Sequence, residues 1–167
     1  MSAINEKHNF TFEFRPVTKL FEEQVRLHPD KCAAATSKES LTYSQLNEKA
    51  NRIANSLIEK GVGREVIVGV VLDRCCDFYA VRQGILKAGG AFAVAAPDYP
   101  DDRIQFIFED AGVPFIITTK DIADERKDLF SKLPAAVLLL EELLEHANAS
   151  NPDVKISEHD LCYCIYT

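Results

Sequence analysis

Apolar and polar positions along this chain follow two different patterns: helical spacing and short continuous apolar runs. Helical spacing of about 3.6 residues is clearest between residues 43 and 60, where the apolar side chains fall on one face. That face comprises Leu46, Ala50, Ile53, Ala54, Leu57 and Ile58. Short, almost wholly apolar runs lie at 66–72, 92–96, 114–118 and 136–140. Runs of this kind are typical of strands that are buried on both faces, so we expect a strand at each.

Helical and strand-like segments alternate along the chain after residue 60. Helical spacing recurs at 77–88, 103–111 and 122–133, and a last strand is expected at 160–167. This alternation predicts right-handed βαβ crossovers, and hence an α/β fold with a mostly parallel sheet covered by helices on both faces. Before it we expect a helix from Pro16 and short strands at 32–36 and 41–43. We therefore predict an N-terminal arm or linker at 1–15 and one α/β subdomain at 16–167.

Helix ends are marked by polar residues and glycines. Thr42 together with Gln45, or Ser44 alone, is expected to cap the helix at 43–60, and Asp77 the helix that follows it. Gly61 stands where a helix reverses, and either Gly89 or Gly90 is expected to take a positive φ after the next helix.

Composition places the chain among globular proteins. Of its 167 residues 47% are hydrophobic and 27% are charged, with a formal net charge of −7. The acidic balance argues against nucleic acid as a partner, because phosphate binding needs clustered Lys and Arg. We find no signal-like N-terminus and no apolar run of membrane-spanning length, and therefore expect no membrane and a cytoplasmic location.

No catalytic or metal-binding group stands out from the residues alone. The five cysteines are Cys32, Cys75, Cys76, Cys162 and Cys164. Their spacing lacks the C-x-x-C of zinc and redox sites, so we expect no metal and interpret the cysteines as small buried hydrophobes. The histidines show no triad pattern, and no pair of carboxylates is set apart for acid–base chemistry. We assign no catalytic residue.

Two segments carry a family resemblance. The runs Leu41–Leu46 and Leu86–Pro100 are similar to the first two core motifs of amino-acid-adenylating domains of nonribosomal peptide synthetases, in the same order and at a similar separation. The matching positions are Leu41, Thr42, Tyr43, Leu46, Leu86, Lys87, Ala88, Gly89, Gly90, Pro97, Tyr99 and Pro100. The resemblance covers about residues 17–167. One departure is that Val94 and Ala96 stand where the family usually has a proline and an aspartate.

This resemblance implies the N-terminal portion of an adenylate-forming enzyme, ending just before the phosphate-binding loop. Its matching motifs are mainly structural in the family, and Thr167 is the one residue to carry over toward the site, as a contact to an ATP phosphate. The complete domain is expected to use ATP and Mg²⁺, and to load an aminoacyl adenylate onto the phosphopantetheine thiol of a carrier domain. We expect the fragment to need no cofactor and to be inactive alone. Its expected partners are the remainder of the adenylation domain and a carrier protein domain.

Two alternatives remain open. The first is a fragment of an acyl- or aryl-CoA ligase, which shares the fold and the phosphate loop. The second is a non-catalytic scaffold or assembly module, which would self-associate through apolar surface left exposed.

Overall fold

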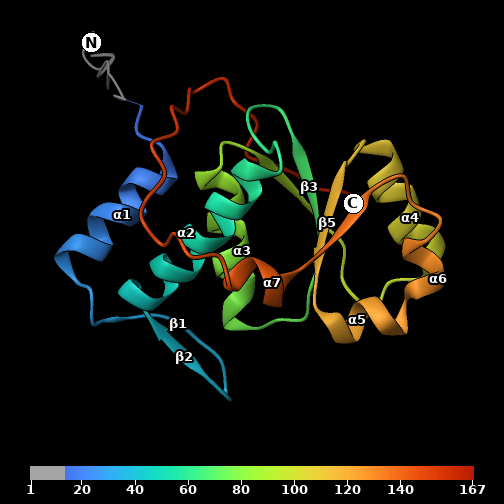
Figure 1. The fold of residues 1–167 in the computed structure, drawn as a ribbon, viewed down its shortest axis with the longest axis horizontal. Coiled ribbons are helices and arrows are strands. Elements are labelled where there is room, and N and C mark those ends of the chain that lie inside the picture. Colours follow the sequence, from blue (N-terminus) through green and yellow to red (C-terminus); the bar gives the residue numbers. More distant parts are fainter. Residues whose placement is uncertain (1–13) are drawn as a thin grey trace, which may run out of the picture.

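The computed structural model describes residues 14–167 (Figure 1), so nearly all of the expected arm at 1–15 lies outside the described residues. Within that range the chain forms seven helices and seven strands. In chain order they are α1 (Val17–Leu27), β1 (Cys32–Ala35), β2 (Ser40–Thr42), α2 (Tyr43–Glu59), β3 (Ile67–Val71), α3 (Cys76–Lys87), β4 (Ala91–Val94), α4 (Asp101–Asp110), β5 (Phe115–Thr118), α5 (Lys120–Glu125), α6 (Lys127–Phe130), β6 (Ala136–Leu139), α7 (Leu140–Leu144) and β7 (Tyr163–Cys164).

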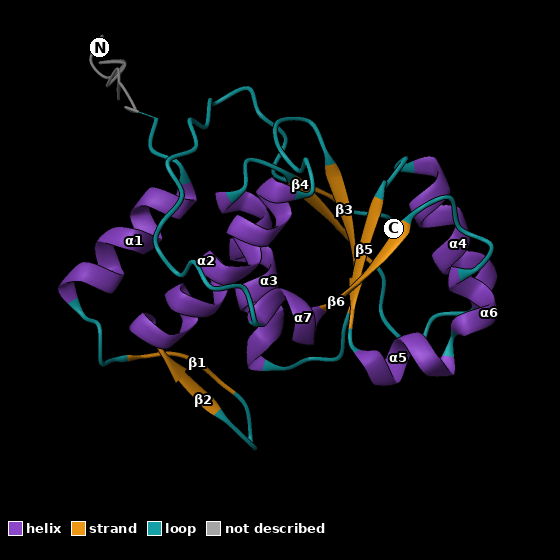
Figure 2. Cartoon of the chain, in the orientation of Figure 1, coloured by secondary structure: helices purple, strands orange, loops and turns teal. Residues whose placement is uncertain are grey.

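Five strands form one sheet in the order β6-β5-β3-β4-β7, and each neighbouring pair is parallel. Figure 2 labels β3, β4, β5 and β6 of this sheet. The expected parallel α/β sheet is therefore confirmed. The short strands β1 and β2 pair antiparallel in a separate sheet beside α2. Parallel strands need crossovers, and the helices between β3, β4 and β5 supply them.

A core lies on each face of this sheet. Side chains of α2, α3 and α7 pack on one face, including Leu57, Ile85 and Leu143, with the partly buried Phe21 of α1 against them. Side chains of α4, α5 and α6 pack on the other, with Phe108 and Phe130 among them. Helices on both faces leave the central strands buried, which explains why those strands read as continuous apolar runs.

Several local predictions are confirmed. Thr42 and Gln45 form a capping box at the start of α2, with Thr42 Oγ1 accepting from the Gln45 N–H at 3.2 Å. Gly61 has a φ of 90° after α2, and Gly89 has a φ of 82° after α3. Gly90 has an ordinary φ, but a Cβ built there would lie 2.9 Å from Val62 Cγ1, so the close approach of the backbone requires glycine.

Three local predictions are wrong. Asp77 does not cap α3: the helix begins one residue earlier, and the Asp77 carboxylate accepts a 2.6 Å hydrogen bond from Lys49 of α2 instead. The helix expected at 122–133 is two short helices, because the backbone leaves helical geometry at Arg126 (φ −110°, ψ 30°). The last strand covers Tyr163–Cys164 and not 160–167, because β4 is its single neighbour among residues 14–167 and pairs with it at two positions.

Candidate functional site

Parallel strands bring their carboxyl ends to one edge of the sheet, where open α/β sheets bind ligands. In the pairing of β4 with β7, Ala93 stands opposite Cys164. Three residues further along each segment come Ala96 and Thr167. Both therefore follow their strands at the same edge, and this edge is the candidate site.

A groove of about 580 Å³ opens at this edge, after β3 and β4. Its charged lining consists of Asp73, Arg74 and Asp98, which stand among apolar side chains. The wall includes Val94 and Ala96, the two positions that depart from the family pattern. A carboxylate in place of Ala96 would point its charge toward this groove or its rim, so the departure changes the electrostatics of the candidate site itself.

The segment between β4 and α4 is held in place by Arg126. Its Nη1 donates to Asp101 Oδ1 at 2.7 Å and to the carbonyl oxygen of Tyr99 at 3.0 Å. Pro100 immediately precedes α4, and its carbonyl oxygen accepts hydrogen bonds from the N–H groups of Arg103 at 3.0 Å and Ile104 at 3.1 Å. This bonding positions the Pro97–Pro100 part of the second motif at the carboxyl edge of the sheet.

Thr167 lies exposed at that edge. Its carbonyl oxygen accepts a 3.2 Å hydrogen bond from Arg103 Nη2, and its hydroxyl has no partner among residues 14–167. The preceding Tyr166 donates its hydroxyl to Asp110 Oδ2 at 2.6 Å, and this hydrogen bond to a carboxylate raises the pKa of the tyrosine. Two side-chain contacts to α4 thus orient the end of β7, while the Thr167 hydroxyl stays available.

The remaining motif residues lie in the turn into α2 and at the end of α3. Leu41, Thr42, Tyr43 and Leu46 form the turn into α2, where the Tyr43 ring lies 5.9 Å from that of Phe21. The stretch from Leu86 to Gly90 surrounds the end of α3, at the amino end of β4. The structure therefore brings Pro97, Tyr99 and Pro100 to the edge that carries Thr167, and leaves the other motif positions at the opposite edge or on α2.

Lys87 is a buried connector that the sequence reasoning missed. Its Nζ donates to Glu22 Oε1 at 2.7 Å, Asn47 Oδ1 at 2.8 Å and Asn151 Oδ1 at 2.9 Å. The side chain is 1% exposed, and burial lowers the pKa of its ammonium group despite the opposing effect of Glu22. An ammonium has three donors, and all three are used, so Lys87 ties α1, α2 and the segment after α7 to the end of α3.

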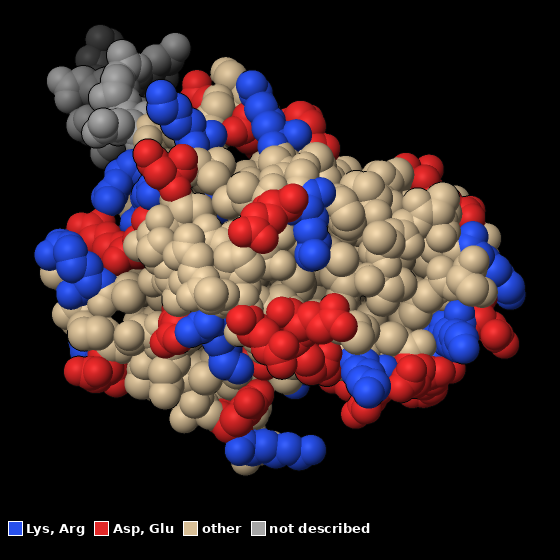
Figure 3. Space-filling model, viewed as in Figure 1, with Lys and Arg blue, Asp and Glu red and all other residues tan. Residues whose placement is uncertain are grey.

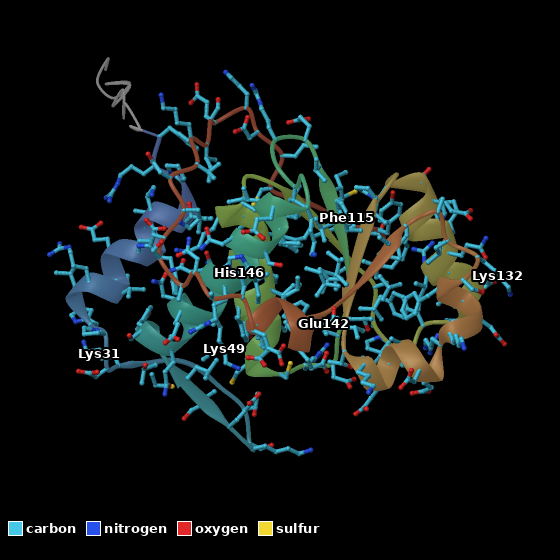
Figure 4. All side chains as sticks on the ribbon, in the orientation of Figure 1. Lys31, Lys49, Phe115, Lys132, Glu142 and His146 are labelled. Atoms are coloured by element: carbon cyan, nitrogen blue, oxygen red, sulfur yellow. The ribbon has the colours of Figure 1, made fainter. Side chains whose placement is uncertain are left out.

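A row of amides on α2 holds the segment that leads to β7. Asn51 Nδ2 donates to the carbonyl oxygen of Ala149 at 2.8 Å, and Asn55 Nδ2 donates to those of Asn148 and Ser150. Arg52 donates to the carbonyl oxygen of His146, a residue labelled beside α2 in Figure 4. The spacing of Asn47, Asn51 and Asn55 at every fourth residue places them on one helix face, a signal that the sequence did contain.

The cysteines only partly follow their expected role. Cys76 is buried, Cys75 and Cys164 are half-buried, and Cys32 and Cys162 are exposed, so the interpretation as buried hydrophobes is wrong for the last two. Over residues 14–167, no group of three His, Cys, Asp or Glu side chains is placed to hold a metal ion.

Charged side chains of both signs are interspersed over the face in Figure 3, with the largest acidic group below its centre. None of the helices between residues 14 and 167 combines the length and the apolar character needed to cross a bilayer.

Comparison with known proteins identifies the protein family of this chain. The sequence profile described as "AMP-binding enzyme" matches residues 21–167, and the chain belongs to this family. Its curated relatives include zwittermicin A synthase ZmaJ of Bacillus cereus, 41% identical over 90% of this chain and 28% of the relative, and tyrocidine synthase 3 of Brevibacillus parabrevis, 40% identical over 89% and 2%. The chain thus spans less than a third of the length of each of these relatives.

Solved structures of AMP-binding enzymes resemble this chain as well. The synthetase FmoA3, bound to alpha-methyl-L-serine-AMP, superimposes with a TM-score of 0.83 at 33% identity, over 92% of this chain and 17% of that one. A fatty acyl CoA synthetase of Mycobacterium tuberculosis reaches a TM-score of 0.80 at 21% identity and shows the shared fold. Within the AMP-binding enzymes, the chain corresponds to the N-terminal portion of an adenylation domain of a nonribosomal peptide synthetase.

Proposed function

We propose that this chain belongs to an enzyme that activates an amino acid with ATP and passes the aminoacyl group to a carrier-protein thiol. The observation that carries the proposal is the 41% identity to a zwittermicin A synthase over 90% of the chain. In the proposed reaction a carboxylate oxygen of the amino acid attacks the α-phosphorus of ATP. A new P–O bond forms, the bond to the bridging oxygen of the β-phosphate breaks, and pyrophosphate leaves. The phosphopantetheine thiol then displaces AMP.

Of the residues described, Thr167 is the best candidate for contact with ATP. Its free hydroxyl stands at the carboxyl edge of the sheet, and a hydroxyl there can donate to a phosphate oxygen. The groove beside it has Asp73, Asp98 and a single cation, Arg74, in its charged lining. A triphosphate carries several negative charges, so we assign its main cationic partners to the rest of the complete domain. When bound, Mg²⁺ would neutralise charge on the phosphates.

We therefore expect residues 1–167 alone to be inactive. Among residues 14–167, the charged lining of the groove offers one cation, Arg74, and Thr167 offers one hydroxyl, which is less than the charge of a leaving pyrophosphate requires. Among the alternatives, a fragment of an acyl-CoA ligase is favoured less, because the acyl-CoA synthetase match at 21% identity supports the shared fold alone. A non-catalytic module remains the alternative if the complete domain has no activity.

Amino-acid-dependent exchange between ATP and radiolabelled pyrophosphate tests the proposal on the complete domain that contains this chain. We expect exchange with one amino acid or a few, and background exchange with residues 1–167 alone. In the complete domain, Thr167→Val should weaken the use of ATP about tenfold, which corresponds to the loss of one hydrogen bond to a charged group. Thr167→Ser keeps the hydroxyl and should retain most activity. Thioester formation from a fatty or aryl acid and CoA, without amino-acid-dependent exchange, would establish the ligase alternative instead.

A further inference from the structure

The segment that carries Thr167 receives little support from the main sheet. β7 pairs with β4 through Tyr163 and Cys164, and among residues 14–167 no later pair joins the two strands. Ile165 follows, 72% exposed, and after it come Tyr166 and Thr167. A strand ladder fixes the residues that take part in its hydrogen bonds. The position of Thr167 therefore depends on contacts from outside the sheet.

One side of α4 supplies these contacts. Arg103, Phe106 and Asp110 are three and four residues apart, which places them on the same side of the helix. Arg103 Nη2 donates to the carbonyl oxygen of Thr167 at 3.2 Å, and the Tyr166 hydroxyl donates to Asp110 Oδ2 at 2.6 Å. The rings of Phe106 and Tyr166 meet nearly at right angles, with 6.1 Å between their centroids. Tyr166 and Thr167 are thus held at three points by a single helix.

Both polar contacts involve a charged group. A hydroxyl that donates to a carboxylate, or a guanidinium that donates to a carbonyl oxygen, makes a stronger hydrogen bond than two neutral groups do. The Arg103 guanidinium also lies 5.7 Å from the centroid of the Phe106 ring, a cation–π distance that favours one orientation of the arginine. These contacts can therefore hold the backbone at Thr167 in one place.

The helix that makes these contacts is itself firmly anchored. Its adjoining side is packed in the core through three side chains that are at most 2% exposed: Ile104, Ile107 and Phe108. Arg126 binds Asp101 in its first turn at 2.7 Å. Phe106, by contrast, is 51% exposed, and Asp110 is exposed as well. A rigid helix with a separate, solvent-facing set of contacts is suited to positioning a group, because these contacts can change without opening the core.

We propose that Arg103 and Asp110 are positioning residues for ATP, which hold the Thr167 hydroxyl where it meets a phosphate oxygen. Arg103 acts on the backbone of Thr167, and Asp110 acts through Tyr166. The inference rests on the proposed function, because that function assigns Thr167 as the ATP contact. Since these side chains act on the ATP contact, their loss should alter the use of ATP and not the use of the amino acid.

Amino-acid-dependent pyrophosphate exchange by the complete domain that contains this chain tests the proposal. Arg103→Gln, Asp110→Ala and Tyr166→Phe should each raise the KM for ATP by about three- to tenfold, with kcat and the KM for the amino acid within about twofold. Arg103→Lys keeps a cationic donor and should recover part of the loss. ATP binding, measured by titration calorimetry without the amino acid, should weaken by the same factor as the KM rises.

A double variant distinguishes positioning from a general structural effect. Thr167→Val removes the hydroxyl on which Arg103 and Asp110 are proposed to act. Adding Arg103→Gln to Thr167→Val should therefore raise the KM for ATP no further, because two changes in one linked set of contacts are not additive. Independent losses that multiply in the double variant would overturn the proposal.

Matched controls are available on α4 and α3. Glu109→Gln removes a carboxylate of α4 that accepts from Gln105 at 2.8 Å, and Tyr79→Phe removes an exposed tyrosine hydroxyl of α3. Both should leave the KM for ATP as it is. Hydrogen exchange of residues 1–167 gives a readout without activity: Tyr166→Phe and Asp110→Ala should speed exchange in the peptide 161–167, and both controls should not.

The outcomes separate this proposal from the proposed function. Unchanged hydrogen exchange at 161–167, or an unchanged affinity for ATP in Arg103→Gln and Asp110→Ala, would overturn the positioning role while amino-acid activation stands. A complete domain that shows no amino-acid-dependent exchange would overturn the proposed function. Calorimetry with ATP alone would then still decide whether Arg103 and Asp110 position the ATP contact.

Discussion

Lys87 Nζ lies 2.7 Å from Glu22 Oε1, joining the end of α3 to α1 across 65 positions of sequence. The contact is almost dry on the lysine side, where the side chain is 1% exposed, and 14% exposed on the glutamate side. Two amides complete the hydrogen bonding of the ammonium group. A buried cation that keeps all its donors paired makes the fold sensitive to either partner, since removing one leaves an uncompensated buried group.

Replacing Lys87 tests that sensitivity. Lys87→Met keeps the apolar stem but removes three hydrogen bonds and leaves Glu22 without its buried partner. We expect the free energy of unfolding to fall by about 3 kcal/mol, measured by urea denaturation at neutral pH. Lys19→Met is the matched control, because Lys19 Nζ binds the other oxygen of Glu22 at 3.0 Å but is 45% exposed. Exposed pairs contribute less than about 1 kcal/mol. Equal losses in both variants would contradict the role of burial.

The same pair predicts an acid dependence of stability. Burial on its own would raise the pKa of Glu22, but the hydrogen bonds and charges of Lys87 and Lys19 outweigh it, so the pKa lies below the ordinary value of 4.5. The unfolded chain then binds more protons than the folded chain in this window, and the stabilisation present above pH 4.5 is lost as pH falls through the folded-state pKa.

Urea denaturation at a series of pH values measures this effect. Glu22→Gln should flatten the fall in unfolding free energy below pH 4.5, while substitution of the exposed Glu142 to Gln should leave the slope as it is. An unchanged slope in Glu22→Gln would rule out Glu22 as a source of the acid dependence.

Gly84 within α3 allows the backbones of α2 and α3 to pack closely together. A Cβ built there would lie 2.7 Å from Ile53 Cγ2 and 3.0 Å from the backbone oxygen of Ala50. Gly84→Ala should therefore destabilise by about 1–3 kcal/mol, although alanine favours an isolated helix by about 1 kcal/mol. Thermal unfolding measures the change. Gly63→Ala, with no atom within 4 Å of the built Cβ, should change stability by less than about 0.5 kcal/mol.

The capping box of α2 should contribute measurably. Besides the bond from the Gln45 N–H to Thr42 Oγ1, the Thr42 N–H donates to Gln45 Oε1 at 2.9 Å. Thr42→Ala removes the first acceptor and should cost about 1 kcal/mol in unfolding free energy. Thr42→Ser keeps the hydroxyl oxygen and should lie within a few tenths of the unchanged chain. A loss as large in serine as in alanine would show that the methyl group, and not the cap, is responsible.

Local patterns predicted the buried elements of this chain well. The α2 helix was found from the helical spacing of its buried face, and the strands β3, β4 and β5 from continuous apolar runs, because burial on both faces demands apolar residues throughout. Prediction failed at the ends of helices, at Asp77 near the start of α3 and at Arg126 after α5. There the outcome depends on a partner distant in sequence, such as Lys49, or on a backbone break without a Gly or Pro to mark it.

Some features of the candidate site were likewise predictable from the sequence, and others were not. Pro97, Tyr99 and Thr167 were singled out from a family resemblance, and the structure places all three residues at one edge of the sheet. Lys87 was noticed as a motif position, yet its three partners come from α1, α2 and the segment after α7. The contacts of Arg103 and Asp110 with the end of β7 were likewise invisible in the sequence, since they join residues 64 and 56 positions apart.

The sequence by itself determined the α/β class, the order of helices and strands and the family, because each rests on patterns within a short window of residues. Tertiary structure alone decided the strand order β6-β5-β3-β4-β7, the burial of Lys87 and the contacts of α4 with the end of β7. These features depend on which distant segments pack together, and neither local spacing nor propensity encodes that choice directly.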